Sequence, residues 1–306
     1  MDLIMGMNSG SSFDGIDVIL AETEMAEDGF PKAPRFICGG SYEWPKEVAD
    51  IVQNAFVNKV DMVGLNRLNY LCGAVFAEKA AQFMRENKID SKEIKVLGLD
   101  TQTIYQEQPN HAAITNMTIE EKDNWVGRWL SGNYPCGTQM GDTSVIANLI
   151  DIDTVTHFRP ADHASGGAAA PLMPYLDYIL FRDKPGYTMT LNIGGIANLH
   201  VANADRRRMF GFDTGPGNII SNYMCKVLLG LEYDKDGVIA ASGKVDASLM
   251  DHFMKHPFWD LYLVPDGLRI TVKNILRQLF RNSVSYQKKI SLLPHVHLQV
   301  KQLQEA

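Results

Sequence analysis

Three short stretches rich in glycine and polar residues lie at the ends of apolar runs. They are NSGSS at 8–12, NIGGIAN at 192–198 and GFDTGPGN at 211–218. Glycine lets the backbone approach a ligand closely, and the N–H groups of such a turn can converge on one anion, phosphate above all. Each stretch alone is also typical of an ordinary turn, but three in one chain favour a shared phosphate-binding role.

The first stretch adds hydroxyl and carboxylate side chains to its glycines. Serine hydroxyls are donors for phosphate. Asp14 and Asp17 are candidate ligands for Mg²⁺, which prefers hard oxygen ligands and keeps much of its hydration. The alternative is a plain β-hairpin that turns at Asp14-Gly15. The residues predicted to bind phosphate here are Ser9, Gly10, Ser11, Ser12, Asp14, Gly15 and Asp17.

The other two glycine stretches lie in the second half of the chain. Gly194-Gly195 separates two apolar strands, which is also typical of a hairpin turn. Gly-Pro-Gly at 215–217 precedes an apolar helix, whose N-terminal N–H groups favour an anion. The sequence contains neither G-x-x-x-x-G-K-[ST] nor a G-x-G-x-x-G turn that opens a βαβ unit. The predicted phosphate-binding residues are Gly194, Gly195, Asn198, Asp213, Gly215, Gly217 and Asn218.

The stretch RPADHASGGAAAP at 159–171 has a different character, because it combines charged residues with a small-residue run. Asp162 can act as a general base if it lies within hydrogen-bond reach of its proton donor. Asp162 is equally consistent with the N-cap of a following helix. The residues alone leave both interpretations open.

The elements that must position these residues alternate between strands and helices, which indicates an α/β fold. The second half of the chain repeats the order of the first half: strands, glycine turns, helix. Residues 104–136 lack clear periodicity and are predicted to form an irregular connection or an insertion between two lobes, 1–135 and 136–306. Strands are predicted over 2–7, 16–23, 34–44, 94–100, 153–158, 187–195 and 196–203, helices over 45–56, 65–87 and 142–150, and a strand, turn and helix within 208–230.

The composition narrows the functional class. The chain has 306 residues, 45% of them hydrophobic, which is enough for a large core in two lobes. Its net charge of -7 and the lack of a basic block argue against nucleic acid as a partner. The four cysteines have neither metal nor redox spacing. The sequence shows no signal peptide pattern and no long apolar run, so we expect a cytoplasmic protein that does not span a membrane.

Together these stretches resemble the anhydro-N-acetylmuramic acid kinase family, within the sugar kinase, actin and Hsp70-like ATPase superfamily. NSGSSFDGID corresponds to the family motif M-S-G-T-S-L-D-G-I-D, with Asn8, Ser11 and Phe13 as departures. HFRPADHASGGAAAPL corresponds to D-F-R-x-x-D-x-A-x-G-G-x-G-A-P-L. LNIGGIANL and GFDTGPGN match the family almost letter for letter. The match covers about residues 3–257.

The resemblance implies a two-lobed, actin-like ATPase fold of the ribonuclease H-like type, with a cleft between the lobes and with ATP and Mg²⁺ as cofactors. It implies a kinase that hydrolyses the 1,6-anhydro ring of its amino-sugar substrate and phosphorylates O6, giving N-acetylmuramate 6-phosphate for peptidoglycan recycling. Asp162 stands in the place of the catalytic aspartate, and the first loop in that of the ATP-phosphate loop. The family precedent also implies a homodimer.

The chain departs from the family at two places. In LDTQT, Asp100 and Thr101 stand where the family motif S-H-G-Q-T has histidine and glycine. After HPF at 256–258 the family's Pro-Pro-Lys-Ser/Thr-Gly segment and its glycine-rich CGGG stretch have no counterpart, so we expect the C-terminal part to be incomplete relative to the family. These departures favour the alternative of a catalytically impaired relative that binds nucleotide or serves as a partner protein.

Overall fold

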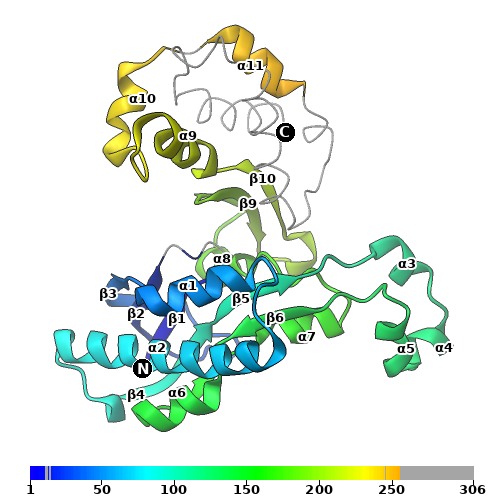
Figure 1. Ribbon diagram of the computed structural model, residues 1–306. Coiled ribbons are helices and arrows are strands. Elements are labelled where there is room, and N and C mark those ends of the chain that lie inside the picture. The colour runs from blue at the N-terminus through cyan, green and yellow to red at the C-terminus, as the bar shows by residue number, and fades with distance from the viewer. Residues whose placement is uncertain (11–12, 14, 245, 256–306) are drawn as a thin grey trace. The chain divides into compact units, whose positions relative to one another are not determined.

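The computed structural model describes residues 1–10, 13, 15–244 and 246–255 (Figure 1). The chain divides into two compact units, Met1–Leu172 and a second unit from Met173 on. This division comes later in the chain than the predicted lobe boundary, because residues 137–150 pack within the first unit. The lobe boundary itself stays a prediction. None of the described helices is both long and apolar enough to cross a membrane.

A five-stranded sheet forms the centre of the first unit, in the order β3-β2-β1-β4-β7. β1 pairs antiparallel with β2 and parallel with β4, so the sheet is mixed. The predicted strands are confirmed, although the last is only two residues long. Their bounds are β1 (Asp2–Asn8), β2 (Ile16–Thr23), β3 (Arg35–Tyr42), β4 (Ile94–Asp100) and β7 (Thr154–Val155).

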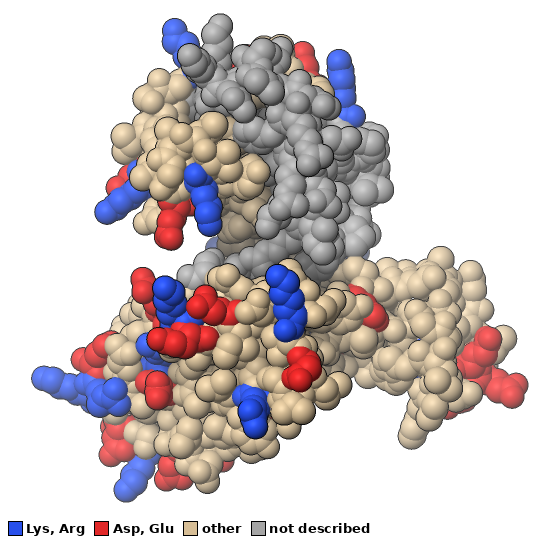
Figure 2. Space-filling view, in the orientation of Figure 1, with Lys and Arg blue, Asp and Glu red and all other residues tan. Residues whose placement is uncertain are grey.

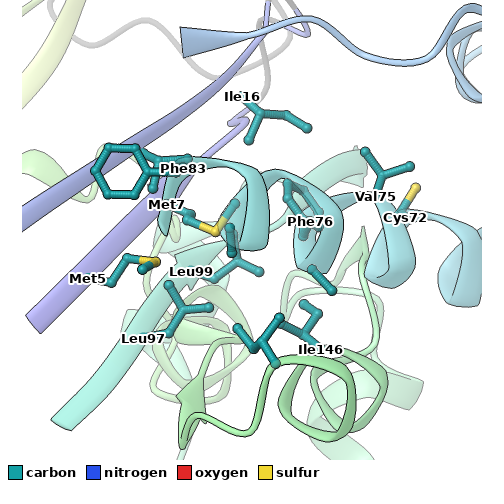
Figure 3. Packing of buried hydrophobic residues seen from close by; sticks show 14 of the residues in the cluster. Met5, Met7, Ile16, Cys72, Val75, Phe76, Phe83, Leu97, Leu99 and Ile146 are labelled. Atoms are coloured by element: carbon teal, nitrogen blue, oxygen red, sulfur yellow. The ribbon is translucent and has the colours of Figure 1, made fainter. Parts of the chain in front are cut away.

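Three helices supply most of the remaining first core: α1 (Lys46–Ala55), α2 (Met62–Asn87) and α6 (Thr143–Ile150). All three were predicted. α2 begins where the Asp61 side chain accepts a hydrogen bond from Gly64 N, the N-cap arrangement that satisfies an otherwise unpaired amide. α2 contacts β2, β3, α1 and α6. Figure 3 shows Phe76 and Phe83 of α2 in one apolar cluster with side chains of β1, β4 and α6.

Residues 104–136, predicted to be irregular, contain short regular elements. β5 and β6 form a two-stranded antiparallel sheet, and Figure 1 shows the short helices of this stretch on an arm that extends from it. An Asn or Thr side chain caps the N-terminus of each of these helices. Each helix has only five or six residues, which is too few to show apolar periodicity in the sequence. The bounds are β5 (Gln102–Gln106), α3 (His111–Asn116), α4 (Ile119–Asp123), α5 (Trp125–Leu130) and β6 (Gly137–Met140).

The second unit contains an antiparallel sheet in the order β10-β9-β8. As predicted, a glycine turn separates the first two strands, and a second glycine stretch leads from the last strand into a helix. The strands are β8 (Tyr187–Ile193), β9 (Ile196–Asn203) and β10 (Phe210–Pro216). The helices that accompany them are α8 (Met173–Phe181), α9 (Ile219–Leu229), α10 (Val238–Ser242) and α11 (Ala247–Met254), with 3-10 turns at Arg206–Arg208 and Lys235–Gly237.

Charged side chains are interspersed on the surface. On the face shown in Figure 2, Lys and Arg lie among Asp and Glu over the first unit, and acidic side chains mark the end of its arm. The exposed triplet Arg206–Arg208 forms a 3-10 turn between β9 and β10, and Asp205 pairs with Arg207 at 2.9 Å.

A polar cluster is buried in the second unit. The Asp177 carboxylate on α8 accepts a hydrogen bond from Thr190 Oγ1 at 3.0 Å and lies 3.0 Å from His200 Nδ1. Asp177 and His200 are each only 2% exposed, and His200 Nε2 has no partner among the described residues. Burial lowers the pKa of His200, against the opposing effect of Asp177. The arrangement therefore suits a neutral imidazole that donates Nδ1–H to Asp177.

The first core should depend on Phe76, which is fully buried on α2. Phe76→Ala removes a ring and leaves a cavity, so it should lower the free energy of unfolding by about 3–5 kcal/mol. Tyr70→Ala on the same helix, where the side chain is 56% exposed, is the matched control and should change stability far less. Urea unfolding followed by circular dichroism measures both. Equal losses in the two variants would contradict this core.

The buried His200 should make stability depend on pH. Its folded pKa lies below the unfolded value, so between the two the unfolded chain binds more protons, and stability falls as pH drops below about 6.5. His200→Gln can still donate to Asp177 but does not titrate. Between about pH 7.5 and about pH 5.5 the melting temperature of the parent should fall more than that of His200→Gln. Parallel curves would show that His200 does not contribute.

Candidate active site

The first predicted loop joins β1 to β2, and its start is fixed by Ser9. Ser9 is 2% exposed, and its hydroxyl lies 2.7 Å from Gln102 Oε1 and 3.2 Å from the Gly15 carbonyl. Trp44 Nε1–H donates to the same hydroxyl at 3.2 Å. The Ser9 hydroxyl is thus engaged by the protein itself, and it holds both ends of the loop together.

An aromatic side chain anchors the middle of the same loop. The Phe13 ring lies 5.3 Å from the Trp44 ring and 5.7 Å from the Phe56 ring, and Trp44 in turn packs edge-on against Phe76 at 5.3 Å. Edge-to-face aromatic pairs at these distances are favourable. The loop therefore rests on the core of the first unit through both a hydrogen-bonded serine and a packed phenylalanine.

The remaining predicted residues of this loop are only partly described. Gly10 has a left-handed φ of 60, which suits glycine, and its carbonyl accepts from Thr103 N at 3.3 Å. Asp17 is exposed at the start of β2 and accepts a hydrogen bond from Ser41 Oγ at 2.5 Å. Predicted residues Ser11, Ser12 and Asp14 lie outside the described residues.

Of the two predicted Mg²⁺ ligands, Asp17 is the one that the structure describes. Over the described residues, no group of three or more His, Cys, Asp or Glu side chains is arranged to hold a metal. Mg²⁺ needs no such cage, because it keeps several waters and binds through one or two carboxylates. The exposed Asp17 carboxylate fits that requirement.

The two glycine turns of the second unit lie against each other. Gly217 N and Ile219 N donate to the Gly195 carbonyl at 2.9 and 3.2 Å, and Asn218 N donates to the Gly194 carbonyl at 2.6 Å. A Cβ on Gly217 would lie 2.0 Å from Gly194 O, so this close approach requires glycine there. The structure brings the two stretches together, with these three amides joining the turns.

Two further predicted residues are neighbours on adjacent strands. Asn198 on β9 pairs with Asp213 on β10, just before an irregularity at Gly215, whose φ is 141. Asn198 Oδ1 is buried and has no hydrogen-bond partner among the described residues. A buried acceptor without a donor is costly unless a ligand or water supplies one. The side chain of Asp213 lies outside the description.

Asp162 lies within α7 (Phe158–Ala164), so the N-cap interpretation is wrong. The side chain is exposed, and Oδ2 accepts a hydrogen bond from Ala169 N at 2.6 Å. A Cβ on Gly167 would lie 2.1 Å from the same oxygen, so the carboxylate rests directly against glycine backbone. A small-residue loop thus folds over the base of the Asp162 side chain and leaves part of it open to solvent.

Sequence reasoning missed the residues that surround this loop. Arg159, 8% exposed, donates from Nε and Nη2 to the two oxygens of Asp100 at 3.2 and 2.7 Å, and from Nη1 to Ala169 O at 2.9 Å. Gln106 Nε2 donates to Ala168 O at 2.9 Å. Arg159 belongs to the RPADHASGGAAAP stretch, and Asp100 is one of the departures from the family motif, but a single sequence does not show that the two residues pair. Gln102 and Trp44 were missed for the same reason.

A buried histidine follows the candidate base. His163 is 2% exposed, and its Nε2 has no partner among the described residues. Burial lowers the pKa of His163, with the neighbouring Asp162 opposing that shift. The lowered pKa favours a neutral imidazole at this place. The next residue toward the N-terminus, Asp162, is by contrast exposed to solvent.

The chain matches the family model of anhydro-N-acetylmuramic acid kinase over residues 2–265. Among curated relatives, anhydro-N-acetylmuramic acid kinase of Vibrio vulnificus (strain CMCP6) is 30% identical over 84% of the chain. The kinases of Francisella tularensis subsp. novicida (strain U112) and Bacillus thuringiensis subsp. konkukian (strain 97-27) are each 31% identical over 83%.

The chain spans 62% of the length of each of these relatives. Among solved structures, a reductive activator for a corrinoid, iron-sulfur protein aligns with 70% of this chain and with 31% of its own length, at 14% identity and a TM-score of 0.35. The family match spans both compact units and includes the first loop, Asp162 and the paired glycine turns. The chain therefore belongs to the anhydro-N-acetylmuramic acid kinase family.

Proposed function

We propose that this chain is an ATP-dependent sugar kinase that opens the 1,6-anhydro ring of anhydro-N-acetylmuramic acid and phosphorylates O6, giving N-acetylmuramate 6-phosphate. The observation that carries the proposal is Asp162. The chain belongs to this kinase family, and the exposed carboxylate of Asp162 accepts a 2.6 Å hydrogen bond from the Ala169 amide, which fixes its position. A general base needs such a defined position together with access to its proton donor.

The proposed fold is the two-lobed, actin-like ATPase fold. Its support is the recurrence of one strand order in both units: β3-β2-β1 in the first and β10-β9-β8 in the second, antiparallel in each case. In both units a glycine-containing turn joins the first two strands of the sheet. The ATP phosphates are assigned to these turns.

In the first loop Ser9 is fixed by Gln102 and Phe13 by Trp44, so these two residues need little ordering when a ligand binds. Asp17 is the described residue that fits Mg²⁺, directly or through water. When bound, Mg²⁺ neutralises charge on the phosphates.

In the proposed reaction Asp162 accepts a proton from a water molecule while the water oxygen attacks the anomeric carbon. The bond between that carbon and O6 breaks, and O6 keeps the electron pair. O6 then attacks the γ-phosphorus of ATP, and ADP leaves. The contribution of the chain is to hold Asp162, the loops and the substrate in register, because phosphoryl transfer depends mainly on positioning and charge stabilisation.

Asp162→Asn should strongly slow the proposed reaction. It keeps the side-chain shape but removes the proton acceptor, so phosphorylation should fall about 10²–10⁴-fold. Sugar 6-phosphate is measured by mass spectrometry after incubation with Mg-ATP and 1,6-anhydro-N-acetylmuramic acid. Asp50→Asn, an exposed change on α1, is the matched control and should keep parental activity. Product from Asp162→Asn at the parental rate would refute the base assignment. A folded parent that binds ATP without making product would favour the impaired relative.

Gln102→Leu should weaken nucleotide binding, because it leaves the buried Ser9 hydroxyl without its closest partner. The hydroxyl keeps the Gly15 carbonyl and Trp44 as partners, so the change removes one hydrogen bond worth about 0.5–1.5 kcal/mol, and the affinity for Mg-ATP should fall about two- to tenfold. Isothermal titration calorimetry measures the dissociation constant. Gln53→Leu on the exposed side of α1 is the control. Equal affinities in the two variants would separate the loop from nucleotide binding.

A further inference from the structure

A nearly buried ion pair lies at the end of β4. Arg159 grips both carboxylate oxygens of Asp100, and the two side chains are 10% and 16% exposed. Gln139 Nε2 donates to Asp100 Oδ1 at 2.7 Å and so supports the pair from β6. Burying charges is costly unless they are paired with good geometry. The two-point contact and the added amide supply that geometry.

The same arginine reaches the loop that holds Asp162. Arg159 Nη1 donates to the Ala169 carbonyl at 2.9 Å, and Ala169 N donates to Asp162 Oδ2 at 2.6 Å. Ala169 is 2% exposed and has a left-handed φ of 58, a conformation that L residues adopt only when their surroundings hold it. Ala169 thus accepts a hydrogen bond from Arg159 with its carbonyl and donates one to the candidate base Asp162 with its amide.

We propose that Asp100 and Arg159 are positioning residues for Asp162: the Asp100 carboxylate fixes Arg159, Arg159 fixes Ala169, and the Ala169 amide fixes the Asp162 carboxylate. The catalytic role of Asp162 rests on the proposed function, whereas the chain of contacts does not. Asp100 stands where the family motif carries histidine, so the motif itself supplies no carboxylate at this position.

Both members of the ion pair are needed to hold Ala169 in place. Asn at position 100 would present one carbonyl oxygen and one amide group, and the amide hydrogens would face the guanidinium hydrogens of Arg159. Arg159 would then turn away, and Ala169 would lose the contact that holds its carbonyl. A small displacement of a catalytic group is enough to lower a rate strongly. Substrate-binding elements that do not touch this chain of contacts should be unaffected.

The test uses the full chain and four variants. Asp100→Asn and Arg159→Lys break the two-point contact, Asp100→Glu keeps a carboxylate, and Glu22→Gln breaks the exposed 2.6 Å pair with Arg35 as the matched control. The first readout is hydrogen exchange of the Ala169 amide, resolved by fragmentation mass spectrometry, which needs no substrate. The second is kcat and KM for Mg-ATP in the anhydrosugar kinase assay. Thermal melting verifies that each variant is folded.

Asp100→Asn and Arg159→Lys should raise the exchange rate of the Ala169 amide about tenfold or more, with the α2 core unchanged. Their kcat should fall about tenfold or more while KM for Mg-ATP stays within about twofold of the parent. Asp100→Glu should recover part of both losses, and Glu22→Gln should resemble the parent.

Unchanged Ala169 exchange in both folded variants would overturn the proposal. Exchange that rises equally in the α2 core would also overturn it, because the pair would then merely stabilise the fold. If the parent transfers no phosphate, the proposed function fails, and the exchange measurement still decides whether Asp100 and Arg159 position Asp162.

Discussion

The parallel pairing of β1 with β4 is the constraint on which the candidate site depends. Its register sets Asn8 opposite Asp100, so both strands end at the same edge of the sheet. Beyond that edge Ser9 N donates to the Asp100 carbonyl at 3.2 Å, and Ser9 Oγ meets Gln102. The Asp100 side chain meets Arg159 from α7. One strand end therefore supports both the first loop and the helix that carries Asp162.

Buried polar groups, rather than apolar packing alone, define the geometry at this edge. Gln102 is fully buried, and Arg159 is nearly so, and each has several hydrogen-bond partners. Such groups are expensive to bury without partners, so alternative arrangements of the loops that break these bonds are disfavoured. The apolar cluster of α2 holds the sheet and helix together, and the polar contacts select one placement of the two loops.

The sequence was sufficient for most regular elements, because alternation and helical periodicity report which side of an element is buried. β1, β2, α2 and the strand-turn-helix around β10 were all predicted in this way. Side-chain pairing was out of reach. The pairs Asp100–Arg159 and Ser9–Gln102 each join residues that are far apart in the chain. A single sequence does not show which distant side chains contact each other. The short capped helices of the arm were missed because five or six residues are too few to show helical periodicity. The Ser9 hydroxyl, predicted to face phosphate, is engaged by Gln102.

The most direct test of the central claim follows the oxygen of the attacking water. The chain is incubated with Mg-ATP and 1,6-anhydro-N-acetylmuramic acid in water labelled with heavy oxygen, and the reaction is stopped early for mass spectrometry. A water activated by Asp162 and directed at the anomeric carbon places the label in the sugar 6-phosphate, and inorganic phosphate stays unlabelled. Label in inorganic phosphate without labelled sugar phosphate would show that water attacks ATP instead, and would contradict the account.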